Sequence, residues 1–394
     1  MIYRVVNESR MDQVKELWDY CFEKKDDPFF QYYFNEYCGK NNWVIAGFEE
    51  KETFAYLKTM VHVNPYKVRI RNCEDLVPYL VGVATAPEAR GQHLFEPLAK
   101  KTFEVLRSEE VSFVTLMPIY AGIYTPYEFA YYDFRHEYNL TLSDLASLRG
   151  DTYGLRLEKV ELGSVDLSEI YAAYTKNLSG VPLRTEFQWK KLLTVHSLEN
   201  TECVLAYDND ELVGYMLYKL EDETFNAIEI ITLTNESKSA LLNYAAQHQA
   251  QCKEFTWLAP AWDKTYLSFK DQKLSGSYKP FMMARCIDAR RALANLEPDE
   301  ELYGEINLLL NDDLIERNNH LLRLAAVDGE LIVESTMDGE DISMGMAAFT
   351  QMYLGAFTAS ELAEAGLIKV RDEDKLYFLD KLFPKLRTFN NEYF

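Results

Sequence analysis

The sequence predicts an α+β protein in which two similar α+β units are followed by a third α+β domain. The chain has 394 residues, which allows two or three cores at roughly 150 residues per domain. Strand and helix patterns alternate over about the first 145 residues and recur in the same order over about 152–286. The composition, 48% hydrophobic and 14% aromatic, excludes a disordered chain.

The first unit is expected to contain four strands and two helices. Apolar residues recur at helical spacing in each helix, as Val14, Leu17 and Trp18 do in the first. Each strand is predicted from a short apolar run. The expected strands cover 2–6, 43–48, 76–85 and 111–116, and the expected helices cover 11–22 and the stretch from a turn at 87–91 to about 106.

The second unit repeats this order of elements, which indicates a diverged duplication of one α+β unit. Its expected strands cover 153–157, 204–207, 212–220 and 227–233, and its expected helices cover 167–178, 186–195 and 238–251.

The last quarter of the chain differs in character. Residues 286–394 contain 10 basic and 22 acidic residues, so this segment carries 12 of the 22 net negative charges. Strands followed by helices indicate a separate α+β domain. The strands are expected at 305–310, 321–326 and 331–334, and the helices at 346–353, 359–364 and 375–382. The expected domains are therefore 1–148, 149–285 and 286–394.

Charge and residue spacing restrict the partners. A net charge of −22 repels phosphate backbones, so no nucleic acid is expected as a partner, whereas cationic ligands would be attracted. The six cysteines form no C-x-x-C and the histidines no H-E-x-x-H, so neither a metal nor a disulfide framework is predicted. The N-terminus lacks signal-peptide features, and no apolar run reaches roughly 18 residues. A cytoplasmic protein with no membrane partner is expected.

Two passages carry the candidate chemistry. Residues 81–95, VGVATAPEARGQHLF, indicate a strand that passes through a tight turn into a helix, whose free N–H groups can hold an anion such as a pyrophosphate. An ordinary strand-turn-helix explains the spacing equally well. Residues 116–129, LMPIYAGIYTPYEF, are dense in tyrosine, and a buried tyrosine there is either a core residue or an acid.

These passages resemble the GNAT acetyltransferases. The turn is similar to their Q/R-x-x-G-x-G/A pyrophosphate loop, and 116–129 to their L-x-P-x-x-x-x-F-Y-x-x-x-G segment. Within that superfamily the whole chain resembles the Eis-like acetyltransferases, which have two GNAT units in tandem, an M-x-R-x-x-D junction (here 282–288), a domain like a sterol carrier protein and a terminal aromatic residue. The resemblance implies the fold class: two tandem GNAT-like domains, the second degenerate, followed by a sterol-carrier-protein-like α+β domain.

The resemblance also implies roles for individual residues. Tyr124 would protonate the departing thiolate, and the α-carboxylate of Phe394 would act as the base. Acetyl-CoA would be the co-substrate, with no metal. Its binding residues would be Val83, Ala84, Thr85, Arg90, Gly91, Gln92, His93, Leu94, Phe95, Glu96, Ile119 and Tyr120. Three positions depart from the family pattern: His93 and Glu128 replace glycines, and Phe95 replaces a residue that is often small.

The residues themselves suggest where a cationic amine would bind. Asp26, Asp27 and Glu36 lie in a stretch rich in aromatic residues, and acids beside aromatic faces suit cations. The aromatic residues of this stretch at helical spacing, Phe30, Phe34 and Tyr37, are expected in the core.

The leading functional hypothesis is an Eis-like N-acetyltransferase that acts on polycationic, aminoglycoside-like small molecules or on lysine side chains. The resemblance implies a homo-oligomer, a trimer or hexamer. Residues 230–238 of the second unit lack an Arg-led glycine turn, so one acetyl-CoA per chain is expected. The alternatives are another double-GNAT acyltransferase, or a lipid carrier in which the GNAT units serve as a scaffold.

Overall fold

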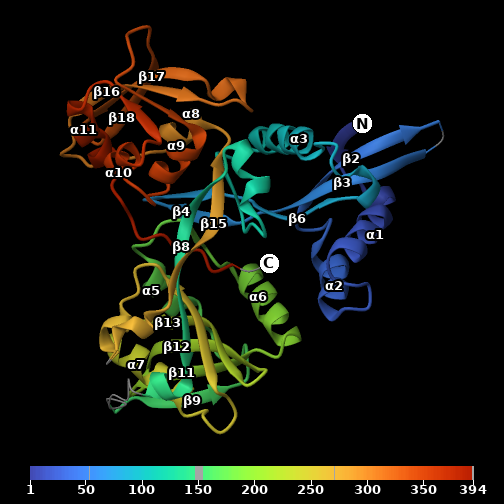
Figure 1. Cartoon of the computed structure of the whole chain (residues 1–394), viewed down its shortest axis with the longest axis vertical. Coiled ribbons are helices and arrows are strands. Elements are labelled where there is room, and N and C mark those ends of the chain that lie inside the picture. The colour runs from blue at the N-terminus through green and yellow to red at the C-terminus, as the bar shows by residue number, and fades with distance from the viewer. Residues whose placement is uncertain (53, 147–153, 270, 393–394) are drawn as a thin grey trace. The chain divides into compact units, whose positions relative to one another are not determined.

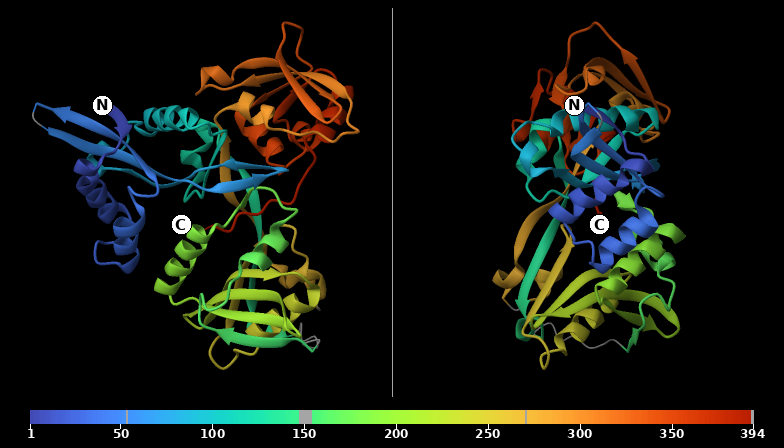
Figure 2. Two further views of the ribbon diagram at one scale, coloured as in Figure 1. Left: turned by 180° about the vertical axis from the view of Figure 1, so that it is seen from behind. Right: turned by 90° about the vertical axis from the view of Figure 1, so that its right-hand side faces the viewer.

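The computed structural model describes residues 1–52, 54–146, 154–269 and 271–392. The chain forms two compact units. The first contains residues 1–132, 282–388 and 392, and the second contains 133–281 with 389–391. In Figures 1 and 2 the first unit is drawn mainly in blue, cyan, orange and red, and the second unit mainly in green and yellow. The expected boundary between 148 and 149 falls outside the described residues, and the expected domain limits stay a prediction.

The N-terminal part of the first unit is a mixed sheet. Strands β1, β2, β3 and β6 are antiparallel neighbours, β6 pairs with β7 in parallel, and β7 pairs with the end of β15. Helix α3 connects β6 to β7, as a parallel pair requires. The strands are β1 (Ile2–Val5), β2 (Trp43–Lys51), β3 (Phe54–Asn64), β6 (Tyr79–Thr85) and β7 (Phe113–Leu116), and the helices are α1 (Met11–Cys21), α2 (Pro28–Tyr32) and α3 (Phe95–Ser108).

The second unit has the same order of pairing. Strands β9, β11, β12 and β13 are antiparallel neighbours, and β13 pairs with β14 in parallel, with α7 between them. This agreement supports the duplication expected from the sequence. The strands are β9 (Arg156–Val160), β11 (Glu202–Asp208), β12 (Glu211–Glu221), β13 (Thr224–Thr232) and β14 (Glu254–Pro260), and the helices are α5 (Ser168–Thr175), α6 (Glu186–Leu198) and α7 (Asn235–Ala246).

Each sheet is completed by a strand from the other half of the sequence. Strand β8 (Ala130–Thr141), which follows β7 in the chain, pairs over 135–141 with β14 of the second unit. Strand β15 (Ser277–Cys286), which follows β14, pairs over 283–286 with β7 of the first unit. The duplicated units have therefore exchanged their last strands, and neither sheet is built from one continuous segment.

Residues 287–388 form a separate sheet covered by helices, drawn in orange and red (Figure 1). Its spatial strand order is β18, β17, β16, β19, β20. Residues of the two layers that meet, including Leu308, Leu324, Phe349 and Leu379, are fully buried, so apolar side chains fill the interior. The strands are β16 (Gly304–Asn311), β17 (His320–Val327), β18 (Glu330–Ser335), β19 (Ile342–Gly345) and β20 (Ile368–Val370), and the helices are α8 (Ala289–Ala294), α9 (Met346–Tyr353), α10 (Ala359–Glu364) and α11 (Asp374–Leu382).

Strands β3, β8, β14 and β15 were not among the elements expected from the sequence. Strand β3 alternates in burial over its first half and is buried on both faces over its second half, so it lacks one continuous period. Strand β8 contains Asp133 and Arg135, whose side chains are 1% exposed and form a 3.0 Å ion pair. A charged pair inside a strand is not signalled by hydrophobic periodicity.

Candidate active site

A bulge in strand β6 shapes the first part of the site. The register between β3 and β6 shifts between Met60 and His62, and Gly82 on β6 has φ +56°. A side chain at Gly82 would collide with the indole ring of Trp18, so glycine is required here for both backbone and packing reasons. The bulge sets the direction of the segment Val83, Ala84 and Thr85 that follows it.

Strands β6 and β7 part soon after they meet. Within these two strands, which the structure describes completely, their pairing is confined to Tyr79↔Thr115. The later residues of β6 pair with β3 on the other side, at Met60↔Ala84 and Thr59↔Thr85. Beyond this pair β7 does not cover the edge of β6, so a ligand can approach Val83 to Thr85 there, although the carbonyls of Ala84 and Thr85 already accept from Thr59 Oγ1 and Arg90 Nε.

The turn after β6 forms an open cradle in front of helix α3. Gly91 has φ +74° and His93 has φ 53°, and a side-chain carbon built on Gly91 would meet nothing within 4 Å. The residue at the N-cap of α3, Leu94, offers no side-chain hydrogen bond, so the first N–H groups of this 14-residue helix have no side-chain cap. Arg90 is exposed and donates from Nε to the carbonyl of Thr85 at 3.3 Å. This arrangement suits a pyrophosphate.

The two positions where the sequence has another residue in place of the glycine of the family pattern both have a positive backbone φ. His93 and Glu128 have φ 53° and 63°, in the left-handed region that glycine adopts without cost. Histidine is among the residues enriched there, whereas a glutamate needs a compensating interaction.

Tyr124 lies between two short turns, Ala121–Ile123 and Thr125–Tyr127. The residue is 9% exposed, and its ring makes edge contacts with Phe95 and Phe129 at centroid distances of 5.4 and 5.9 Å. Burial raises the pKa of Tyr124 to about 12. The phenol therefore carries its proton throughout the neutral range. Phe95, the bulky departure, forms part of the packing of this tyrosine.

The passage before Tyr124 presents apolar side chains to solvent. Ile119 is 97% exposed and Tyr120 is 68% exposed, and Met117 and Ile123 are also exposed. Scattered exposed apolar residues are normal, whereas these four lie within seven residues of sequence.

The expected acceptor residues differ in their surroundings. Asp26 and Glu36 are exposed, whereas Asp27 accepts the N–H of Phe29 at 2.8 Å and thereby caps α2. The expectation that Phe30, Phe34 and Tyr37 are core residues is confirmed, because they are 4%, 7% and 1% exposed. Burial, together with the charges of Tyr32 and Glu392, raises the pKa of Tyr37. Glu392 is itself 4% exposed and lies close enough to influence this segment.

A buried polar cluster beside the bulge was not found from the sequence. The Tyr33 hydroxyl and His62 Nδ1 are 2.8 Å apart, and Asn42 Nδ2 donates to the same hydroxyl at 2.9 Å. Because Asn42 Oδ1 accepts a backbone N–H from Gly39, its Nδ2 is the donor to Tyr33, and the direction of the hydrogen bond between Tyr33 and His62 Nδ1 follows from the tautomer of the histidine. His62 is fully buried, and burial lowers its pKa to about 3. In the sequence, a single histidine in a run of β-branched residues gives no indication that it will be buried in a polar cluster.

The end of the described chain is anchored within the second unit. Phe389 is 3% exposed, donates its N–H to Ser179 O at 3.0 Å and packs its ring against Tyr174 at 5.7 Å. Arg135 donates to the carbonyl of Asn390, and Asn391 Nδ2 donates to Glu229 at 2.8 Å. Residues 389–391 are therefore bound rather than frayed. Phe394, the expected base, lies outside the described residues.

Glu229 is the centre of that anchor. Its carboxylate accepts two hydrogen bonds from Arg184, at 2.8 and 2.7 Å, and one from the Tyr215 hydroxyl at 2.6 Å. Burial opposes ionisation, but Arg184 and these hydrogen bonds outweigh it and hold the pKa of Glu229 below its ordinary value.

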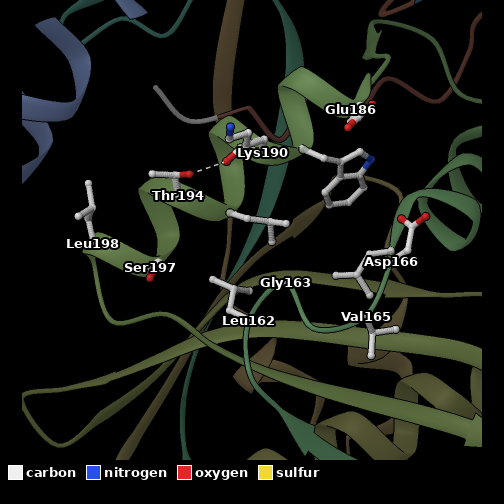
Figure 3. Close-up of a pocket in the computed structure, with 12 residues that line it drawn as sticks. Leu162, Gly163, Val165, Asp166, Glu186, Lys190, Thr194, Ser197 and Leu198 are labelled. Carbon is white, nitrogen blue, oxygen red and sulfur yellow. Dashed lines mark hydrogen bonds between the residues drawn. The ribbon is translucent and has the colours of Figure 1, made fainter. Parts of the chain in front are cut away.

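A pocket of about 640 Å³ lies elsewhere in the second unit, between α6 and the loop that precedes α5. Figure 3 shows Glu186, Lys190 and Thr194 of α6 on one side and Leu162, Val165 and Asp166 of the loop on the other. None of the expected site residues lines this pocket. We therefore place the candidate active site in the first unit, at the opening between β6 and β7 and the turn before α3. The ring of the buried Tyr124 packs there against Phe95 at the start of α3.

Comparison with known proteins identifies the domains. Residues 2–132 and 180–286 each match an acetyltransferase (GNAT) domain family, and residues 287–390 match a sterol carrier protein domain. The chain consists of two GNAT acetyltransferase domains and a sterol carrier protein domain. The expected fold class is thereby confirmed, and the GNAT domains support an acyltransferase that uses acetyl-CoA as co-substrate and an amine acceptor.

Solved structures share the complete architecture at low sequence identity. A probable N-acyltransferase of unknown function from Enterococcus faecalis is 19% identical with a TM-score of 0.88, and both chains are fully covered. A GCN5-related N-acetyltransferase from Anabaena variabilis is 18% identical with a TM-score of 0.83, again over both full chains. Eis1 from Mycobacterium abscessus is 16% identical with a TM-score of 0.70, covering 89% of this chain and 90% of its own. No curated protein sequence matches the chain.

The two GNAT domains differ at the start of the helix that follows the bulged strand. In the second domain, Thr234 and Ser237 cap α7 reciprocally, and Ser237 N–H donates to Thr234 Oγ1 at 3.0 Å. Each helix has one acidic residue in its first turn, Glu236 in α7 and Glu96 in α3. The difference is therefore the side-chain cap, which helix α3 of the first GNAT domain lacks. Within the part of the chain that the structure describes, no helix is long and apolar enough to cross a membrane.

Proposed function

We propose that this protein transfers an acetyl group from acetyl-CoA to primary amines of polycationic small molecules, aminoglycoside-like in class, or to lysine side chains. The observation that carries the proposal is the juxtaposition, in the first GNAT domain, of an open strand, an uncapped helix start and a buried tyrosine. Acetyl-CoA would supply the activated acetyl thioester. The expected cytoplasmic location and the homo-oligomer belong to the same proposal.

Individual residues would divide the work of binding. Backbone groups of Val83, Ala84 and Thr85 along the edge that β7 leaves uncovered would hold the pantetheine amides and the acetyl carbonyl. Arg90 would supply positive charge to the pyrophosphate, which would lie on the N–H groups of the turn and the start of α3. Leu94, Phe95, Glu96, Ile119 and Tyr120 would form the walls of the cleft, with Gly91, Gln92 and His93 in the loop.

Tyr124 would act on the departing sulfur. Its raised pKa keeps the phenol protonated but makes it a weak acid toward a thiolate, whose conjugate acid has a pKa of about 8.5. The phenol would therefore contribute a hydrogen bond that strengthens as negative charge develops on sulfur, with proton transfer following.

The acceptor amine must be positioned and must lose a proton. Asp26 and Glu36 are exposed acids in the expected acceptor segment, and the net charge of −22 favours cations of several charges. The bound tail and the buried position of Glu392 support a role for the chain terminus, because Phe394 follows two residues later. Its α-carboxylate would pair with the ammonium, orient it and accept its proton directly or through water.

A thiol-release assay with a panel of amines tests the proposal. Polyamines and aminoglycosides should be acetylated, neutral amines of equal size should be poor acceptors, and KM should rise with ionic strength because exposed charges are screened. Release that is independent of the amine, or a KM unaffected by salt across the cationic series, would count against it. Lipid that co-purifies without turnover would favour the carrier alternative.

A further inference from the structure

The segment that carries Tyr124 is tied to the sterol carrier protein domain by Glu128. Helix α9 begins after Gly345, which supplies no side-chain cap. Glu128 Oε2, more than two hundred residues earlier in the sequence, accepts the N–H of Ala347 in the first turn of this helix at 2.8 Å. A side-chain carbon on Gly345 would lie 3.0 Å from the same oxygen, so the approach is close. Capping α9 is the interaction that compensates the φ of 63° at Glu128.

Arg285 forms a second tie to the same segment. Its Nη1 donates to the carbonyl of Tyr127, and its Nη2 donates to both carboxylate oxygens of Asp312 at 2.7 and 2.8 Å. Arg285 and Asp312 are 0% and 3% exposed. Asp312 is held in turn by the N–H groups of Leu314 and Ile315, both at 2.9 Å. The guanidinium is therefore fixed by the sterol carrier protein domain while it holds the active-site segment.

Arg285 holds a residue that hydrogen-bonds to Tyr124, and Glu128 is the residue next to it. The carbonyl of Tyr124 accepts the N–H of Tyr127 at 2.9 Å and the N–H of Phe129 at 3.4 Å. Glu128 lies between these two donors. A third bond, from Gln351 Nε2 on α9 to the carbonyl of Tyr131 at 2.8 Å, holds the chain just beyond them.

We propose that Glu128 and Arg285 are positioning residues, through which the sterol carrier protein domain fixes the orientation of Tyr124. This inference rests on the proposed role of Tyr124 as proton donor. The sterol carrier protein domain then contributes to catalysis by holding the turn 124–129 on the side that the first GNAT domain would leave exposed. The sterol carrier protein domain needs no ligand of its own for this role. The M-x-R-x-x-D junction at 282–288 has a structural role in this scheme, because its arginine is Arg285.

Three substitutions of Glu128 separate positioning from stability. Glu128→Gly removes the tie but relieves the left-handed backbone, so folding is preserved. Glu128→Ala also removes the hydrogen bond to Ala347 but keeps a non-glycine residue at a positive φ. Glu128→Gln keeps a side-chain oxygen that can accept from Ala347. We expect kcat to fall by about tenfold in the Gly and Ala variants and to stay within about twofold in the Gln variant, with the KM for acetyl-CoA unchanged in all three, because displacement of a catalytic group acts on the chemical step.

Gln351→Met offers an independent variant that removes the third bond at similar side-chain size, and it should lower kcat in the same direction. A kcat of Glu128→Gly within twofold of the original protein overturns the proposal. An equal loss in Glu128→Gln and Glu128→Gly overturns the hydrogen-bonded role.

Hydrogen exchange tests the tie without reference to turnover. Backbone amides of 124–129 should exchange faster in Glu128→Gly than in the original protein, and Glu128→Gln should restore slow exchange. Exchange that is unchanged in Glu128→Gly would overturn the tie itself. If the unmodified protein acetylates no amine, the proposed function fails, and the exchange measurement alone then decides whether the tie exists.

Discussion

His62 should make the first unit unstable at moderately acidic pH. The imidazole is fully buried against Trp18, with ring centroids 4.8 Å apart, and its Nδ1 lies within hydrogen-bond distance, 2.8 Å, of the Tyr33 hydroxyl. Among the described residues, its hydrogen-bond partners are Tyr33 and Cys38, and neither is a carboxylate. Burial lowers the pKa of His62 from 6.5 to about 3, so the folded state keeps the ring neutral.

The direction of the pH effect follows from that shift. In the unfolded chain His62 binds a proton below about pH 6.5, whereas in the folded protein it does so only near pH 3. Stability is therefore fully present above the unfolded pKa and is lost as pH falls toward 3. At about 1.4 kcal/mol per pKa unit, the loss between pH 8 and pH 5 is about 2 kcal/mol.

Urea unfolding at several pH values, followed by tryptophan fluorescence, measures this loss. His62→Asn places an oxygen near the position of Nδ1 and cannot titrate, so its free energy of unfolding should depend less on pH than that of the original protein by about 2 kcal/mol over the same interval. His196, whose pKa burial also lowers, contributes in the same direction to both proteins and cancels in the difference. Equal pH dependence in the two proteins would refute the neutral, buried state of His62.

Four further predictions concern the active site. Tyr124→Phe should lower kcat on the order of a hundredfold with little change in acetyl-CoA affinity by calorimetry, whereas Tyr127→Phe should change kcat less than about threefold. Because burial raises the pKa of Tyr124 to about 12, ionisation of this group should not reduce kcat below about pH 11, and a decline near pH 10 that Tyr124→Phe abolishes would contradict the raised pKa of Tyr124. Calorimetry should give one acetyl-CoA site per chain, which Arg90→Glu abolishes and Arg90→Lys weakens only modestly; two sites of similar affinity would contradict the difference between the caps of α3 and α7. Deleting Phe394 or adding a C-terminal tag should severely reduce turnover and Phe394→Ala should reduce it moderately, with acetyl-CoA binding retained; normal turnover of a tagged protein would rule out the terminal carboxylate as base.

Local physical chemistry determined much of what the sequence predicted. Helices such as α1 and α9, with bounds within one residue of those expected, follow from apolar spacing, because a helix is stabilised by neighbours three and four residues away. The strand-turn-helix at 81–95 was equally visible, since a turn and a helix start depend on adjacent residues. The positive φ of His93 and Glu128 agrees with the positions where a glycine pattern was broken.

Only the tertiary structure decided the interactions between distant segments. The exchange of β8 and β15 between the two sheets, the burial of His62 against Trp18 and Tyr33, and the capping of α9 by Glu128 each join residues that are far apart in sequence. The same holds for Asn391, whose partner Glu229 gives no periodic signal. Such pairs depend on register, burial and desolvation, which arise only after the elements have packed, so a local pattern contains no information about which distant partner each polar side chain will meet.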